Sequence, residues 1–356
     1  MSRPYVPALD GYRAIAVLAV MLYHTNLPMF GLGWAGVPLF FVLSGYLITG
    51  ILIDSRSSVN FFSTFYGRRI LRIFPAYYLL LLLGLAYAWI THHPFSDAPW
   101  YFAYLQNFRL AERQWSADFP WPWNHTWSLA VEEQFYLVVP LLVRLVPLRW
   151  LERTFVGMVV FSILFKVSLF ALHGRSITLY PQTFANLDLL CAGAWLACRS
   201  HRCDGAQLAR ICAFIAGSAT VAYGAAILLL PSVHAPWMSM DLRGLEWILF
   251  HTWMVAVVPM GLQVVVSQRF PQLRSVLTWK PLLYTGRISY GLYLYHAVVF
   301  ALSDEAAYHF GIPWGWWSAP TKFLLTYLAA ACSWWLLEEP LLRLKRYFVY
   351  RDRSLS

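Results

Sequence analysis

Arg13 and His24 stand near the two ends of one apolar segment, GYRAIAVLAVMLYHTN at residues 11–26. At about 100° per residue, their separation places both side chains on one face of a helix. A rise of about 1.5 Å per residue puts them roughly 16 Å apart along the helix axis. A guanidinium group binds anions and an imidazole accepts protons, so one elongated ligand could contact both.

A carboxylate lies at a comparable depth to His24. In WSLAVEEQFYLVVP at 127–140, Glu132 follows the start of an apolar helix by roughly 9 Å, and His24 sits about one turn below the same surface. Depth therefore permits His24 and Glu132 to meet. The alternative interpretations are a hydrogen-bonded packing histidine at 24 and a structural ion pair of Glu132 with a Lys or Arg. His125 and His296 are weaker candidates, and His296 could serve only in packing.

An arginine pair stands at the opposite end of the predicted apolar helices from His24 and Glu132. The segment YGRRILRIFP at 66–75 places Arg69 and Arg72 three residues apart at the predicted start of a helix, with Arg68 beside them. Guanidinium groups match phosphate oxygens, and a helix N-terminus adds a favourable field. We therefore expect a phosphate site here, although ordinary topology anchoring would also explain the cluster.

Three further polar residues have both functional and structural interpretations. Arg13 could bind the same phosphates or pair with Asp10 three residues earlier. Glu338 closes the last apolar segment and could instead form a helix-end salt bridge with Arg343. Ser44, followed by a glycine, could mark only a point of close helix packing.

The composition identifies the class of protein that holds these residues. Of 356 residues 59% are hydrophobic and only 12% are charged, whereas a soluble chain carries about 25% charged residues. Five cysteines show neither a CxxC pair nor zinc spacing, so we expect no metal site. The net charge of +10 comes mainly from loops on one side of the membrane, which argues for a topology signal and against nucleic-acid binding.

The pattern predicts an all-α, polytopic transmembrane helical bundle of about ten spans with both termini cytoplasmic. Every predicted inner loop is basic, and the first apolar segment lacks a signal-peptide cleavage site, so it should remain as the first span. The segment 99–108 is expected to be interfacial or re-entrant, and the loop 92–125 could cap a cavity or form an aromatic belt. The sixth span is the least secure, because it contains Asn186 and Asp188. The predicted spans are 8–26, 34–53, 73–91, 126–147, 154–173, 184–199, 209–230, 246–267, 282–302 and 318–338.

Six segments together resemble the integral-membrane acyltransferase family three, the bacterial O-acyltransferases of surface polysaccharides and related acceptors. They occur in family order and cover nearly the whole chain, while 150–280 matches only as generic spans. Some relatives carry an appended SGNH-type domain, which we do not expect in a single domain of residues 1–356. The six segments are LDGYRAIAVLAVMLYH at 9–24, VPLFFVLSGYLITG at 37–50, RRILRIFPAYY at 68–78, WSLAVEEQFYLVVP at 127–140, ISYGLYLYH at 288–296 and LEEP at 337–340.

The resemblance implies a multi-pass enzyme of the bacterial inner (cytoplasmic) membrane. It would move an acyl group, most commonly acetyl, from cytosolic acyl-CoA to a hydroxyl of an extracytoplasmic or lipid-linked glycan, in modification of the cell envelope. Acyl-CoA would be a donor substrate, with no tightly bound cofactor. The sequence gives no indication of an oligomeric state.

The same resemblance assigns roles to individual residues. His24 would act as general base or carry the acyl group transiently, and Glu132 would orient His24 or stabilise its imidazolium. The CoA phosphates would contact Arg13, Arg69, Arg72 and Arg68. Supporting residues would be Glu338, Ser44, Tyr290, His296, Trp127 and Ser128.

A transporter is the main competing interpretation, because buried histidine and carboxylate groups could form a proton relay. Against it, the sequence shows no two-fold internal repeat and no matched pair of broken helices. A non-catalytic assembly protein is a third class.

Overall fold

The computed structural model describes residues 5–92, 95–115, 123–173, 178–229, 244–313 and 315–351, and within these ranges every regular element is a helix. This confirms the all-α prediction. The α-helices are α1 Ala8–Tyr23, α2 Gly36–Asp54, α3 Phe61–Ile90, α4 Ala98–Phe102, α5 Gln106–Glu112, α6 Trp127–Leu145, α7 Leu148–His173, α8 Thr183–Ser200, α9 Gly205–Leu229, α10 Leu245–Ser267, α11 Pro271–Leu277, α12 Lys280–Arg287, α13 Ser289–His309, α14 Ser318–Ser333 and α15 Glu339–Arg343.

Four short helical segments of other types join these. The segments η1 Pro28–Ala35, η2 Asn124–Thr126 and η4 Leu344–Tyr347 are 3₁₀-helices. The segment η3 Trp334–Glu338 is a π-helix, a rare form that often occurs at functional sites.

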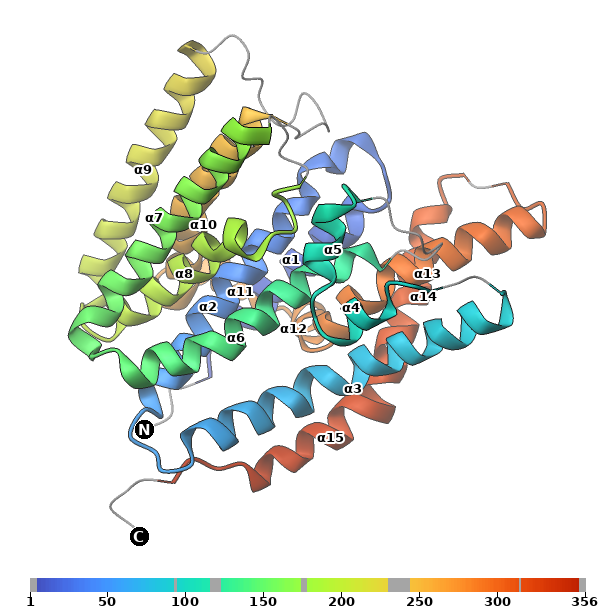
Figure 1. Ribbon diagram of the computed structural model, residues 1–356, viewed down its shortest axis with the longest axis horizontal. Helices are drawn as coiled ribbons and strands as arrows, with labels where there is room; N and C mark the ends of the chain where they lie inside the picture. The colour runs from blue at the N-terminus through green and yellow to red at the C-terminus, as the bar shows by residue number, and fades with distance from the viewer. Residues whose placement is uncertain are drawn as a thin grey trace.

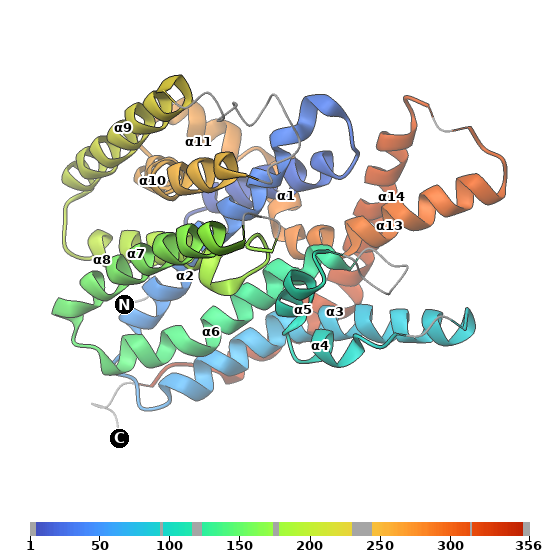
Figure 2. The ribbon, with the colours of Figure 1, turned by 45° about the horizontal axis from the view of Figure 1, so that its top comes forward.

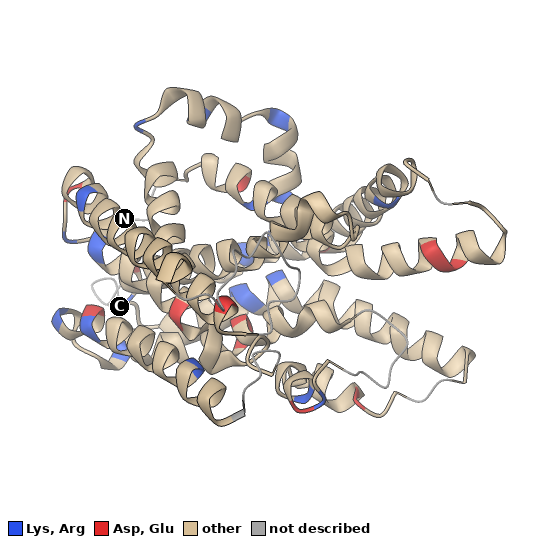
Figure 3. Cartoon of the chain, turned by 90° about the horizontal axis from the view of Figure 1, so that it is seen from above, with Lys and Arg blue, Asp and Glu red and all other residues tan. Residues whose placement is uncertain are grey.

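The helices form a bundle whose middle is built from α1, α2 and α6. On one side lie α7, α8, α9 and α10, and on the other lie α3, α13, α14 and α15 (Figures 1 and 2). The two ends of the described chain lie at the same end of the bundle, where Figure 3 shows several Lys and Arg positions.

In the part of the chain that the structure describes, five helical segments are long and apolar enough to cross a membrane. Two of them, α7 and α9, cover the outside of the bundle and present large apolar side chains, such as Phe214 and Leu228, away from the protein. Such surfaces suit a lipid environment. The other predicted spans also form helices, in α1, α6, α8, α13 and α14. The five segments are Pro28–Asp54, Phe61–Ile90, Leu148–Leu172, Gly205–Leu229 and Leu245–Ser267.

Three predicted spans differ from the helices. The sequence predicts the third span at 73–91 and the fifth at 154–173, but α3 begins at Phe61 and α7 begins at Leu148, because the residues before each apolar run continue the same helix. The span at 282–302 is divided between α12 and α13 at Ile288, whose φ of −93° and ψ of 9° interrupt the helix. The short helices α4 and α5 occupy the segment that was expected to be interfacial or re-entrant.

The crossing of α2 and α8 depends on two glycines. A Cβ on Gly45 would lie 1.9 Å from the carbonyl oxygen of Leu190, and one on Gly193 would lie 2.0 Å from that of Val42. Only residues without a side chain permit this approach, as at other close helix crossings in membranes. The close-packing interpretation of this segment therefore holds for Gly45.

The end of the chain returns to the beginning of α3. Arg68 Nε donates to the carbonyl oxygen of Phe348 at 2.7 Å, and Asn60 Nδ2 donates to that of Val349 at 2.8 Å. The amide of Arg351 donates to the Asn60 side chain in return. These bonds hold the residues after α15 along one edge of the bundle.

The polar residues that weakened the sixth predicted span are partnered in the structure. Lys166 of α7 forms an ion pair with Asp188 of α8, and both side chains are fully buried. Lys166 Nζ also lies 2.9 Å from Nδ1 of His251 in α10, whose Nε2 lies 3.3 Å from Oδ1 of Asn186. This network joins three helices in the half of the bundle formed by α7–α10.

Breaking this buried pair should destabilise the fold strongly. Lys166→Met leaves the Asp188 carboxylate buried without its cation, which typically costs about 3–5 kcal/mol, whereas Lys166→Met with Asp188→Leu should recover most of the loss. Thermal unfolding of the purified protein in detergent measures both. The control is Arg343→Met, which breaks an exposed pair with Glu339 and should cost less than about 1 kcal/mol. Equal losses in Lys166→Met and Arg343→Met would contradict a structural role for the network.

Candidate active site

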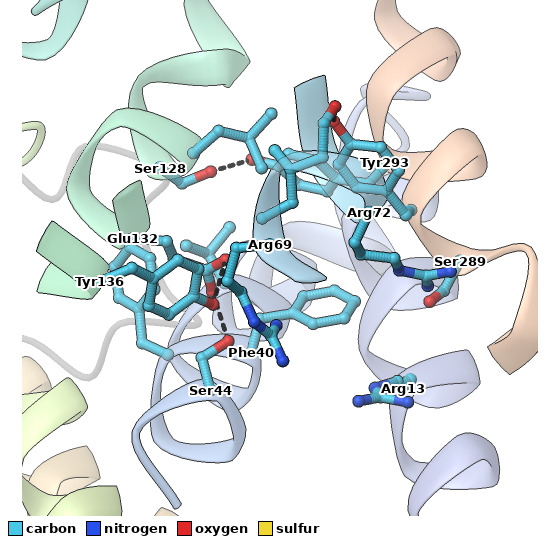
Figure 4. A pocket seen from close by; sticks show the side chains of 15 residues that line it. Arg13, Phe40, Ser44, Arg69, Arg72, Ser128, Glu132, Tyr136, Ser289 and Tyr293 are labelled. Atoms are coloured by element: carbon cyan, nitrogen blue, oxygen red, sulfur yellow. Dashed lines mark hydrogen bonds between the residues drawn. The ribbon is translucent and has the colours of Figure 1, made fainter. Parts of the chain in front are cut away.

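A cavity of about 120 Å³ lies where α1, α2, α3, α6 and α13 converge. It is rich in side chains able to donate hydrogen bonds, and the arginines reach it from different helices than the carboxylate does (Figure 4). Its lining brings together many of the residues predicted from sequence. The lining residues are Arg13, Val37, Phe40, Phe41, Ser44, Arg69, Arg72, Ile73, Ser128, Leu129, Glu132, Tyr136, Ser289, Tyr290 and Tyr293.

Two of the three cavity arginines form no ion pair with any described acidic residue. The guanidinium of Arg69 lies 5.7 Å from the ring centre of Tyr136, and the guanidinium of Arg72 lies 5.9 Å from that of Tyr290. Arg69 Nε is buried and has no hydrogen-bond partner. A buried donor without a partner is costly, so this end of the cavity is suited to an anion.

Arg13 has a partner, as one of the alternatives predicted. Its Nη1 donates to Oδ1 of Asp10 at 2.9 Å, while the side chain still lines the cavity. Arg68 does not line the cavity. It bonds to Phe348 and lies 5.6 Å from the Tyr350 ring centre, so it holds the C-terminal segment, and its expected contact with the CoA phosphates stays a prediction.

The predicted contribution of a helix N-terminus was also wrong. Because α3 starts at Phe61, Arg69 and Arg72 lie more than about two turns inside the helix. The field of unpaired amides falls off within the first turn and does not reach them. The positive character of this end of the cavity therefore comes from the side chains.

Glu132 has different partners from the one expected. Ser44 Oγ donates to its Oε1 at 2.7 Å, and the Tyr136 hydroxyl donates to its Oε2 at 3.1 Å. The structure therefore does not pair Glu132 with His24, because the neighbouring helix presents Ser44 to the carboxylate. Glu132 is no ion-pair partner of a described Lys or Arg either. Ser44 is more than a packing residue, since it fixes the carboxylate in the cavity wall.

His24 belongs to a histidine cluster beside the cavity. Its Nδ1 lies 2.9 Å from the carbonyl oxygen of Val20 and 3.2 Å from Nε2 of His296. The ring of His125 lies 5.0 Å from that of His296. His296, expected as a weaker candidate with a packing alternative, thus contacts His24 directly.

Tyr293 connects the cavity with the histidine cluster. Its side chain lines the cavity, and its hydroxyl lies 2.5 Å from Ser128 Oγ and donates to the carbonyl oxygen of His125 at 2.8 Å. Its own carbonyl oxygen lies 2.7 Å from Nδ1 of His296. Tyr293 therefore connects the polar wall of the cavity with the histidine cluster. The sequence interpretation did not single out this residue.

The remaining supporting residues divide between lining and packing. Tyr290 lines the cavity and donates to the carbonyl oxygen of Ile73 at 2.7 Å. Trp127 is buried and packs at 4.8 Å between ring centres against Tyr180, so it supports α6 without reaching the cavity.

Glu338 occupies the last residue of the π-helix and is buried. Ser333 Oγ donates to its Oε1 at 3.2 Å, while its Oε2 is buried without a hydrogen-bond partner. Arg343 pairs with Glu339 instead, so the helix-end salt bridge suggested for Glu338 was wrong.

Comparison with known proteins identifies the family. The family model described as an acyltransferase domain matches residues 6–339, nearly the whole chain. The chain belongs to this acyltransferase family. The match spans all five helices that line the cavity, so the site lies within the family domain.

Curated relatives of this family match over nearly all of the chain. The protein named peptidoglycan O-acetyltransferase OatA of Listeria monocytogenes is 29% identical, with 100% of this chain and 60% of the relative covered. The putative peptidoglycan O-acetyltransferase YrhL of Bacillus subtilis is 29% identical, with 95% and 55% covered. The O-acetyltransferase OatA of Staphylococcus aureus is 29% identical, with 96% and 58% covered. The chain thus spans less than two thirds of these relatives. No solved structure matches it.

One basic residue, just after the segment that the family model matches, lies near the cavity arginines and was not singled out from the sequence. Lys345 follows the last span, and burial, together with the positive charges of Arg69 and Arg72, lowers its pKa to about 7. In the sequence, Lys345 belongs to a basic run that is typical of a topology signal. The return of the C-terminal segment onto α3 brings Lys345 within electrostatic range of the arginines.

Anion binding at this site should weaken as the pH rises through 7. Lys345 is protonated below its lowered pKa and neutral above it, whereas sulfate keeps its charge throughout. Isothermal titration calorimetry with sulfate should show affinity falling from pH 6 to pH 9. Lys345→Met should bind more weakly at pH 6 and vary less with pH. The exposed Lys280→Met serves as the control and should behave as the original protein does. An identical pH dependence in Lys345→Met would contradict a role for Lys345.

Proposed function

We propose that this protein is a membrane O-acetyltransferase that moves an acetyl group from cytosolic acetyl-CoA to a hydroxyl of an extracytoplasmic or lipid-linked glycan. One observation carries the proposal: a cavity in which two of the three arginines form no ion pair with a described carboxylate joins, through Tyr293, a cluster that contains His24. The names of the relatives support the reaction class and suggest peptidoglycan as an acceptor to test first.

The arginine end would hold the phosphate groups of CoA. Arg69 and Arg72 offer guanidinium donors that no described carboxylate neutralises by an ion pair, and Arg13 adds a third beside them. Phosphate oxygens accept hydrogen bonds from such groups in a forked geometry. Dense positive charge in a partly buried site also favours an anion more strongly than it would in water.

The histidine end would activate the acceptor. A neutral imidazole removes a proton from the hydroxyl as the oxygen attacks the thioester carbonyl. A transient acyl-histidine is the alternative route. Glu132 would stabilise the cavity wall by accepting hydrogen bonds from the hydroxyls of Ser44 and Tyr136. It would not orient His24.

The proposed membrane arrangement has ten spans in the inner membrane with both termini in the cytoplasm. The basic loops at one end of the bundle agree with the positive-inside pattern. This orientation places the arginines toward the cytosolic donor and His24 toward the outer side. The transporter alternative is not favoured, because the curated relatives are named as O-acetyltransferases.

Removal of the proposed base should abolish transfer without preventing membrane insertion. His24→Ala is expected to lower the transfer rate by at least about 100-fold, the usual contribution of a general base. Membranes given acetyl-CoA labelled in the acetyl group and peptidoglycan fragments measure the label in the glycan. His309→Ala, on the exposed end of α13, is the matched control and should retain activity. Full activity in His24→Ala would refute the assignment.

Removal of the arginine pair should weaken donor binding. Each charged hydrogen bond contributes about 1.5–3 kcal/mol, so Arg69→Ala with Arg72→Ala should lower the affinity for CoA by at least about 100-fold. Binding is measured by titration of the purified protein with CoA. Arg153→Ala removes an exposed arginine of α7 that stacks on Trp150 and should leave affinity unchanged. Unaltered affinity in the double variant would mean that Arg69 and Arg72 only set topology.

A further inference from the structure

The contact between His24 and His296 fixes which nitrogens carry protons. Nδ1 of His296 lies 2.7 Å from the carbonyl oxygen of Tyr293, and a carbonyl oxygen can only accept a hydrogen bond. Nδ1 of His296 therefore carries a proton and donates it. In a neutral ring the other nitrogen, Nε2, is then an acceptor.

That acceptor points at His24. Nε2 of His296 lies 3.2 Å from Nδ1 of His24, which also lies 2.9 Å from the carbonyl oxygen of Val20. Both neighbours of Nδ1 are acceptors, so Nδ1 of His24 must carry the proton and share it between them. Nε2 of His24 is consequently left with a lone pair.

The opposite arrangement is disfavoured by the same contacts. If His24 were protonated on Nε2, the lone pair on Nδ1 would face the Val20 carbonyl oxygen and the His296 lone pair. A doubly protonated His296 could donate to Nδ1, but it would place a positive charge among buried rings, with His125 5.0 Å away. No described carboxylate forms an ion pair or hydrogen bond with His296 to offset that charge.

We propose that His296 is a positioning residue that, together with the Val20 carbonyl, holds His24 in the tautomer whose Nε2 is free to accept a proton. The inference rests on the proposed function of His24 as the base. It assigns to a neutral imidazole the orienting role that a carboxylate fills in a Ser-His-Asp triad.

The assignment gives the reaction a defined proton path. Nε2 of His24 takes the proton of the acceptor hydroxyl while the oxygen forms a bond to the thioester carbonyl carbon. The carbon–sulfur bond then breaks, and the thiolate takes the proton from Nε2, which yields the ester and the CoA thiol. Throughout, the Nδ1 proton of His24 stays between Val20 and His296, which stabilise the imidazolium by accepting it.

Nitrogen-15 NMR of the full chain labelled at histidine, in detergent, tests the tautomer without requiring activity. The resonances of His24 are identified by their loss in His24→Gln. The expected result is a protonated Nδ1 and an unprotonated Nε2 in the resting protein. A protonated Nε2 with an unprotonated Nδ1 would overturn the proposal, whether or not the protein transfers acetyl groups.

Kinetics of paired variants separate positioning from structure. His296→Leu removes the acceptor and should lower kcat by about 10- to 100-fold with little change in the KM for acetyl-CoA, part of the loss expected for a general base. His296→Gln keeps an oxygen acceptor and should restore most of kcat. The control is His309→Leu on the same helix. Equal activity in His296→Leu and His309→Leu, or equal losses in His296→Leu and His296→Gln, would overturn the proposal.

Discussion

The cost of placing charge in an apolar interior governs this structure. A buried charged group requires a partner, and most of the buried polar groups have one. Lys166 is neutralised by Asp188, and Glu132 accepts hydrogen bonds from two hydroxyls. Arg69 and Arg72 share one cavity and form no close ion pair with a described carboxylate, although the buried Glu338 attracts Arg72 over a longer distance. An imbalance of this kind is stable only where an anion or water completes it, which is why the cavity is the candidate site.

Helix α13 makes this cavity and the histidine cluster one unit. It supplies Tyr290 and Tyr293 to the cavity wall, and one turn later it supplies His296 to the cluster. The same helix thus presents residues to Arg72 and to His24. Any movement of α13 would change both ends of the site together.

Much of the helical fold could be predicted from the sequence, because apolar segments long enough to span a membrane can be recognised from the order of the residues alone. For the site, the sequence predicted only how deep each residue lies along its helix. Spacing along a helix gave the heights of His24 and Glu132, but their neighbours depend on how each helix is rotated within the bundle. Ser44 consequently took the place beside Glu132, and His296 took the place beside His24. Lys345 was missed because its position depends on the returning C-terminal segment.

The central claim is that one site spans the cavity arginines and the histidine cluster. The most direct test is a structure of the protein bound to an acetyl-CoA analogue in which a non-hydrolysable ketone replaces the thioester. We expect the phosphates beside Arg69 and Arg72, with the pantetheine arm entering the cavity toward Tyr293 and the histidine cluster. Phosphates held elsewhere on the protein, or an arm directed away from Tyr293 and His24, would contradict it.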